Sequence, residues 1–217
     1  MNVEQARFNM IEQQIRPWDV LDTSVLSLLS VVRREDFVPA IHRSLAFMDL
    51  SIPLPAGQCM LTPKLEARLV QELNLSKRDN VLLVGAGTGY VAALLAHKCK
   101  RVIALENHAD LVTMARQNLR QANVGNAEVV QADGSTGLAA QAPFDAILLT
   151  GSVTTVPAGL FEQLKAGGRL LAVVGREPVM QGVMFNKDAQ GQITQQSLFD
   201  TVVPPMDGMA SARPFTF

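Results

Sequence analysis

The chain has 217 residues, of which 48% are hydrophobic and 18% charged, and its net charge is −1. These values are typical of an ordinary globular protein with one domain, or one domain and a modest extension. They argue against a nucleic-acid partner, because the basic residues are scattered and only 5% of the residues are aromatic.

The chain also lacks the sequence features of membrane and disulfide-bonded proteins. No apolar run reaches the ~20 residues that cross a bilayer, and the first residues, MNVEQARFNM, have no signal-peptide pattern. We therefore expect a cytoplasmic protein without a membrane partner. Cys59 and Cys99 show no CxxC spacing, and the three histidines show no ligand spacing, so we expect neither a disulfide nor a metal site.

Helical periodicity and proline-rich loops characterise the first third of the chain. Apolar residues recur at helical spacing over 3–15 and again over 23–32. Prolines and a glycine punctuate 36–63, which predicts short strands and loops. A third helix is predicted over 63–73. We expect residues 1–79 to form a helical, substrate-covering layer on the rest of the protein.

Strands and helices alternate from residue 80 onward. The apolar strands are nearly continuous, which favours a parallel sheet buried on both faces. Two further segments, joined through Gly191, predict edge strands. The fold class is therefore α/β, a doubly wound sheet over 80–217 beneath an N-terminal helical and loop layer. The predicted strands are 81–84, 101–106, 127–133, 144–150, 169–175, 180–187 and 192–203, and the helices are 90–98, 108–122 and 156–167.

The stretch VLLVGAGTGY (81–90) places three glycines at the carboxyl end of the first strand, where such sheets bind ligands. A nucleoside triphosphate is excluded, because a P-loop needs a lysine that is absent here. A dinucleotide is disfavoured, because Tyr90 takes the place of the small residue that ends the G-x-G-x-x-G/A fingerprint. NAD nevertheless stays open as a distant alternative.

The third candidate is S-adenosyl-L-methionine, with S-adenosyl-L-homocysteine as its product. The G-x-G-x-G spacing resembles motif I of the Rossmann-like methyltransferases. Glu106 ends the next strand, and a carboxylate there can accept both ribose hydroxyls. Asp133, which follows the third strand, is expected to contact the adenine amino group. The predicted cofactor residues are Gly85, Ala86, Gly87, Thr88, Gly89, Glu106, Asn107, Asp133, Gly134 and Thr150.

Longer stretches resemble one methyltransferase family, the protein-L-isoaspartate O-methyltransferases. They include RREDFVPAIHRSLAFMDLSIPLPAGQ (33–58), VLLVGAGTGYVAALLA (81–96) and NVGNAEVVQADGSTG (123–137). The resemblance implies repair of damaged proteins by methylation of the abnormal carboxylate of isoaspartyl residues. It also implies that an isoaspartyl protein or peptide is the partner, that Thr150 faces the pocket and that residues 57–63 cover the acceptor.

One motif departs from the family. The family usually has Thr-x-Ser-x-Pro after "GQ", and its serine hydroxyl lies against the substrate carboxylate. The serine position is Leu61 here, and loss of such a hydrogen bond costs about 1.5–3 kcal/mol. Thr62 could supply a hydroxyl through a one-residue shift, so the catalytic residue stays unidentified. The predicted substrate-side residues are Gln58, Cys59, Met60, Leu61 and Thr62.

This departure leaves alternatives to isoaspartyl repair. One is a methyltransferase acting on another acceptor, including an unidentified small molecule. Another is a non-catalytic protein that binds S-adenosyl-L-methionine. The absence of an acid–base constellation does not argue against an enzyme, because an ionised carboxylate needs no general base and in-line alignment supplies most of the acceleration.

Overall fold

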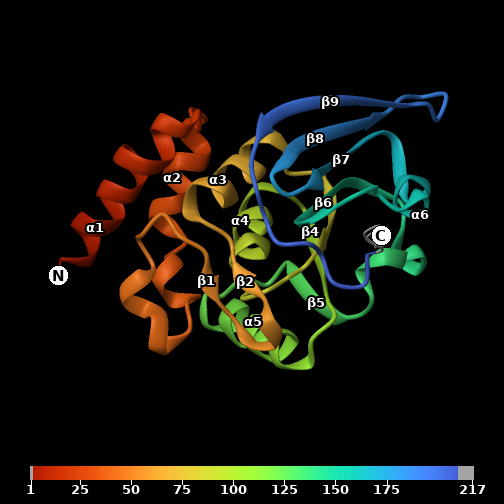
Figure 1. The fold of residues 1–217 in the computed structure, drawn as a ribbon. Coiled ribbons are helices and arrows are strands. Elements are labelled where there is room, and N and C mark those ends of the chain that lie inside the picture. Colours follow the sequence, from red (N-terminus) through yellow and green to blue (C-terminus); the bar gives the residue numbers. More distant parts are fainter. Residues whose placement is uncertain (1, 210–217) are drawn as a thin grey trace, which may run out of the picture.

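The computed structural model describes residues 2–209, and its centre is a seven-stranded mixed sheet in the order β5-β4-β3-β6-β7-β8-β9 (Figure 1). The strands β5, β4, β3, β6 and β7 run parallel, and β8 and β9 add an antiparallel edge. The predicted α/β class and the C-terminal edge strands are confirmed. The strands are β3 (Asn80–Val84), β4 (Arg101–Glu106), β5 (Ala127–Gln131), β6 (Phe144–Val153), β7 (Leu164–Arg176), β8 (Val179–Lys187) and β9 (Ile193–Asp200).

Both faces of the central strands are buried. Val81 and Leu83 of β3 belong to one hydrophobic cluster, whereas Leu82 and Val84 belong to the other. The first cluster includes helices α4 (Tyr90–Lys98) and α5 (Ala109–Gln121), and the second includes α6 (Ala158–Glu162). Burial on both faces explains why these strands are apolar throughout rather than at alternate positions.

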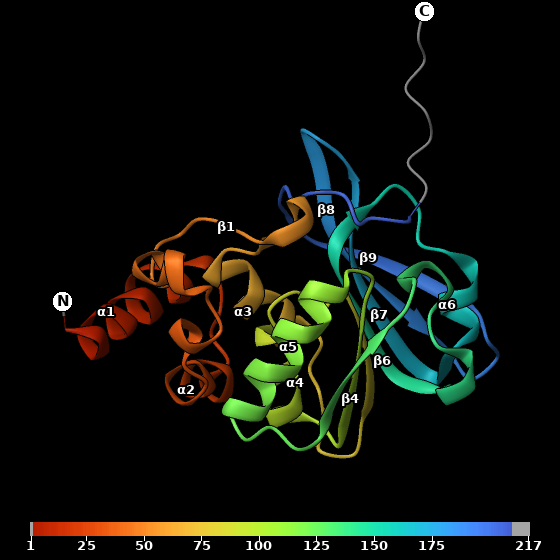
Figure 2. The same cartoon turned by 90° about the horizontal axis from the view of Figure 1, so that it is seen from below.

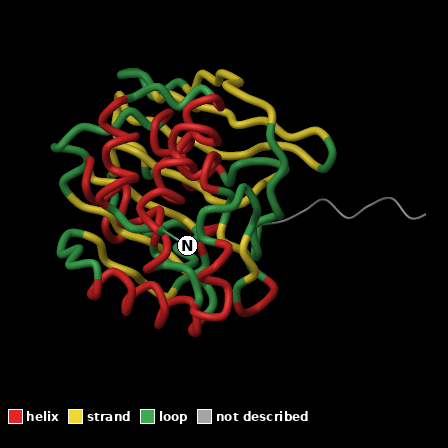
Figure 3. Tube along the Cα trace, turned by 90° about the vertical axis from the view of Figure 1, so that its left-hand side faces the viewer, coloured by secondary structure: helices red, strands yellow, loops and turns green. Residues whose placement is uncertain are grey.

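The N-terminal layer packs on the same side of the sheet as α4. Figure 2 shows α1 (Val3–Met10) and α2 (Thr23–Val31) on the outside, with α3 (Pro63–Glu72) between them and the core. A small antiparallel pair, β1 (Ile52–Pro53) with β2 (Cys59–Met60), lies in the same layer. Viewed from the N-terminal side, most of the helices lie in front of the strands (Figure 3). The division expected between residues 79 and 80 stays a prediction. One hydrophobic cluster contains residues from both sides of it.

Several predicted boundaries are wrong. The helix expected over 156–167 ends at Glu162, because β7 begins at Leu164, which pairs with Phe144 of β6. The strand expected over 127–133 ends at Gln131, since Asp133 instead caps a short 3₁₀ helix. By contrast, the helical segment predicted over 3–15 is confirmed, because α1 ends at Met10 and a π-helical turn continues it from Ile11 to Ile15. No helix in the described part of the chain is long and apolar enough to span a membrane.

Candidate active site

A pocket lies at the carboxyl ends of the parallel strands, beside β3, where the strand order reverses, as is usual for ligand sites in such sheets. The chain contributes to it from the loops after β3, β4 and β5, from Thr150 and Gly151 within β6, from residues 58–61 and Glu66, and from the C-terminal segment. Its lining includes Gln58, Cys59, Met60, Leu61, Glu66, Gly85, Ala86, Gly87, Thr88, Tyr90, Glu106, Asn107, His108, Gly134, Thr150, Met206 and Asp207.

The glycine loop directs its backbone N–H groups into the protein. The N–H groups of Gly85 and Ala86 donate to the carbonyl of Leu105 at 2.9 and 3.0 Å. The N–H of Gly87 donates to the Glu106 carboxylate at 2.8 Å. Phosphate sites need such N–H groups to point at the ligand. This loop therefore offers a close backbone surface rather than an anion-binding nest.

Gly85 has a conformation and a contact that another residue would not tolerate. Its φ is +91°, and an added Cβ would lie 2.2 Å from Thr150 Oγ1. That hydroxyl donates to the carbonyl of Gly85 at 2.8 Å. The side chain of Thr150 thus fixes the start of the loop against the end of β6.

Glu106 is a buried carboxylate at the end of β4, with 6% of its surface exposed. Besides the Gly87 N–H, its other oxygen accepts the N–H groups of Asn107 at 2.9 Å and His108 at 3.1 Å. These three backbone donors fix the orientation of the carboxylate. The side chain lines the pocket with its position fixed, as a ligand-orienting group requires.

The wall of the pocket formed by residues 59–61 is largely apolar. Met60 and Leu61 line it and are almost fully buried. Thr62 does not line it; its carbonyl accepts the first N–H groups of α3. Burial raises the pKa of the Cys59 thiol, which keeps that group neutral. The structure therefore presents Leu61, and not a hydroxyl of Thr62, at this wall.

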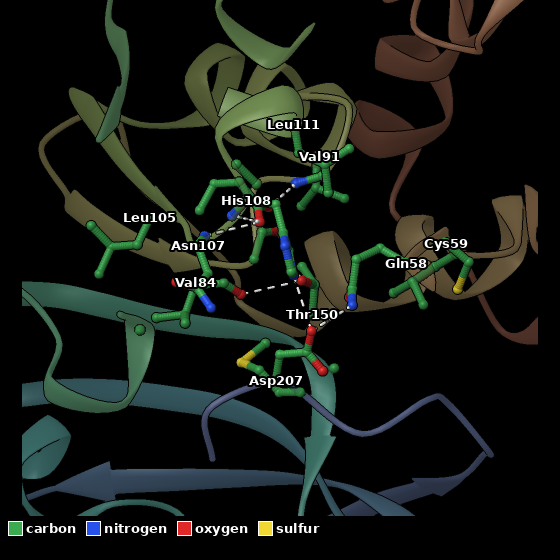
Figure 4. A pocket seen from close by; sticks show the side chains of 18 of the residues that line it. Gln58, Cys59, Val84, Val91, Leu105, Asn107, His108, Leu111, Thr150 and Asp207 are labelled. Atoms are coloured by element: carbon green, nitrogen blue, oxygen red, sulfur yellow. Dashed lines mark hydrogen bonds and ion pairs between the residues drawn. The ribbon is translucent and has the colours of Figure 1, made fainter. Parts of the chain in front are cut away.

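A segment that the sequence did not reveal, residues 204–207, runs along the pocket. Two backbone hydrogen bonds of 2.9 Å fix it to Ser152, just after the end of the pocket-facing part of β6. The Asp207 carboxylate accepts from Gln58 Nε2 at 2.8 Å and lies 3.0 Å from His108 Nε2. Asp207 thus lies between Gln58 and His108, which follows β4, as Figure 4 shows.

Two of the predicted cofactor residues do not line the pocket, Gly89 and Asp133. Gly89 precedes α4 and packs against Ala115, and Asp133 is exposed and caps the N–H of Ser135 at 2.9 Å. All the other predicted cofactor residues lie at the pocket, as do the predicted substrate-side residues other than Thr62. Sequence reasoning did not assign Glu66, Tyr90 or residues 204–207 to the pocket. Glu66 and residues 204–207 reach it through contacts between distant parts of the chain, whereas Tyr90 directly follows the glycine loop and could have been found from that position.

The pocket lining has more acidic than basic side chains. Among the described residues, it contains the carboxylates of Glu66, Glu106 and Asp207 and neither lysine nor arginine, and the charge of Glu66 is paired with Arg34, which does not line the pocket. A pyrophosphate would be repelled by such a lining, whereas a cation would be attracted.

The fold and this site define a Rossmann-like methyltransferase. The sequence model of the protein-L-isoaspartate(D-aspartate) O-methyltransferase family matches residues 5–209, and the chain belongs to this family. It is 37% identical over 208 residues to the protein-L-isoaspartate O-methyltransferase of Koribacter versatilis, covering 96% of this chain and 93% of that one. The Roseobacter denitrificans protein of the same name is 36% identical over 196 residues, covering 90% and 92%.

A solved structure supports the fold assignment. The protein-L-isoaspartate O-methyltransferase of Plasmodium falciparum, in complex with S-adenosyl-L-homocysteine, matches with a TM-score of 0.79 at 20% identity. The match covers 94% of this chain and 98% of that one. The resemblance inferred from the sequence motifs is therefore confirmed at the level of family and fold.

Proposed function

We propose that the protein transfers a methyl group from S-adenosyl-L-methionine to the free carboxylate of isoaspartyl residues in damaged proteins or peptides. Membership of the isoaspartyl methyltransferase family supports the reaction class. The observation that carries the cofactor assignment is the pocket lining, which combines fixed carboxylates with a glycine loop whose N–H groups are largely used internally.

This lining fits S-adenosyl-L-methionine better than a dinucleotide. Glu106 would hold the ribose hydroxyls, since an ionised carboxylate accepts hydrogen bonds from both members of a diol. The bare backbone of Gly85 and Gly87 permits close approach of the remainder of the nucleoside. When bound, the cofactor supplies an activated methyl group on a sulfonium cation. Asp207 and Glu106 favour that cation by their charge.

The protein's own contribution is alignment. A carboxylate acceptor is ionised at neutral pH, so no side chain has to remove a proton from it. The glycine loop, Glu106 and Thr150 fix one side of the pocket, and residues 58–61 fix the acceptor side. Holding the acceptor in line with the methyl group converts an encounter of two molecules into an oriented reaction.

The alternatives of another acceptor or a non-catalytic binding protein are not favoured by the family relationship. The identity of the acceptor is a proposal because Leu61 lines the pocket at the position where the family usually has a serine. We therefore expect slow turnover of isoaspartyl peptides by the wild-type protein.

Replacing Leu61 with serine should raise this turnover. A hydroxyl that donates to the substrate carboxylate contributes about 1.5–3 kcal/mol, which corresponds to a gain of about 10- to 100-fold in kcat/KM. The measurement is transfer of a radiolabelled methyl group from S-adenosyl-L-methionine to a synthetic isoaspartyl peptide.

The matched control is Leu61→Ala, which removes the same apolar bulk but adds no hydroxyl. We expect no comparable gain from it. Equal gains in the two variants would show that space rather than the hydroxyl is limiting. Vigorous activity of the wild-type protein would show that Leu61 is no handicap.

The contacts of Asp207 yield a second prediction. Asp207→Ala removes the contacts with Gln58 and His108, and we expect S-adenosyl-L-homocysteine to dissociate several-fold faster. The free energy of unfolding should change by less than about 1 kcal/mol, because the Asp207 side chain is half-exposed. Surface plasmon resonance measures the dissociation rate, and Asp110→Ala, an exposed acid on α5, is the control. An unchanged dissociation rate would show that Asp207 does not contribute to cofactor binding.

A further inference from the structure

We propose that Arg34 is a positioning residue for the acceptor side of the pocket. It contacts pocket-lining residues of three separate segments without lining the pocket itself. This inference rests on the proposed function, because it concerns how the acceptor wall of that same site is held.

Arg34 fixes the backbone of Leu61. Arg34 Nη2 donates to the carbonyl of Leu61 at 2.8 Å, and Arg34 Nε donates to the carbonyl of Ala46 at 3.0 Å. The planar guanidinium has its donors in a fixed fork, so two such bonds define its orientation. The backbone at the acceptor wall is thereby tied to the 3₁₀ helix Arg34–Asp36 of the N-terminal layer.

Arg34 also balances the charge of Glu66. This residue lines the pocket from α3, has 2% of its surface exposed and forms an ion pair with Arg34 Nη1. A carboxylate this deeply buried needs a paired cation. Without Arg34, Glu66 would present uncompensated negative charge to a carboxylate acceptor, and the two would repel each other.

Arg34 also contacts the beginning of α4. Its guanidinium carbon lies 5.3 Å from the ring centroid of Tyr90, the residue that directly follows the glycine loop. The same ring packs edge-on against Phe37 at 5.4 Å. Arg34 is itself fully buried, and burial lowers its pKa to about 10, so it remains charged at neutral pH.

Lysine at position 34 keeps the charge and loses the fork, so Arg34→Lys tests the proposal without leaving Glu66 unpaired. We expect a KM for the isoaspartyl peptide at least about 10-fold higher, with a Kd for S-adenosyl-L-homocysteine within about 2-fold of the wild-type value. A role confined to stability would lower the melting temperature and leave the ratio of these two constants unchanged.

The matched control is Arg7→Lys. Arg7 is also buried, but its ion-pair partners, Glu4 and Glu35, do not line the pocket. Should Arg34→Lys not fold, the double variant Arg34→Met with Glu66→Gln removes both buried charges together. The proposal predicts that this double variant has a raised peptide KM through the loss of the Leu61 contact.

Hydrogen exchange provides a readout that needs no turnover. We expect faster exchange of the amides in 58–62 in Arg34→Lys than in Arg7→Lys, with those of β3 unchanged. Exchange equal to that of the control, or faster exchange with an unchanged peptide KM, overturns the proposal. If neither the wild-type protein nor Leu61→Ser methylates the peptide, the proposed function fails, while the exchange data still decide on Arg34.

Discussion

Glu106→Gln should abolish most of the affinity for S-adenosyl-L-homocysteine. The two carboxylate oxygens accept three backbone N–H groups, from Gly87, Asn107 and His108. In the glutamine variant, the side-chain NH₂ group would face at least one of these N–H groups. A buried donor would then have no acceptor, which costs about 1–3 kcal/mol. It would also remove the charged acceptor of the ribose hydroxyls. Together these losses predict an affinity at least about 100-fold lower.

Isothermal titration calorimetry measures this affinity directly. Glu128→Gln is the control, because Glu128 lies on the neighbouring strand β5 with 54% of its side chain exposed and is not a lining residue. We expect wild-type affinity from it. If Glu106→Gln bound as tightly as the control variant did, the assignment of the ribose to Glu106 would be wrong.

Gly85→Ala should destabilise the whole protein and inactivate it. The left-handed backbone at Gly85 costs a residue with a Cβ about 1–2 kcal/mol. The added methyl would also lie 2.2 Å from Thr150 Oγ1, which a packed interior relieves only by shifts of about 1–3 kcal/mol. We expect the free energy of unfolding, measured in urea, to fall by about 2–5 kcal/mol.

Gly125→Ala is the comparison for this substitution. An added Cβ at Gly125 meets nothing within 4 Å, and its backbone is not in the left-handed region. Its free energy of unfolding should stay within about 0.5 kcal/mol of the wild-type value. Equal stability of the two variants would mean that the loop is not constrained as described.

The core of the fold and the glycine-loop side of the pocket could be predicted from the sequence because their signals are local. Buried parallel strands such as 81–84 are apolar throughout, and the glycines that follow are adjacent in the chain. Glu106 could be located because the carboxyl ends of β3 and β4 are neighbours in a parallel sheet.

The contacts that hold residues 58–61 and the C-terminal segment could not be predicted in the same way, because they join residues that are distant in the chain. The sequence predicts that Glu66 lies in a helix, but only the structure shows that its partner is Arg34, 32 positions earlier. Asp207 is likewise 149 residues from Gln58. Asp133 follows β5 as predicted but caps a local turn outside the pocket lining, so its contact with the adenine amino group stays a prediction.

The most direct test of the central claim is a crystal structure of the protein grown with S-adenosyl-L-homocysteine. We predict that both ribose hydroxyls lie within hydrogen-bonding distance of the Glu106 carboxylate and that the sulfur atom faces the wall formed by Leu61. A ligand whose ribose lies away from Glu106, or a pocket that stays empty at saturating ligand, would contradict it.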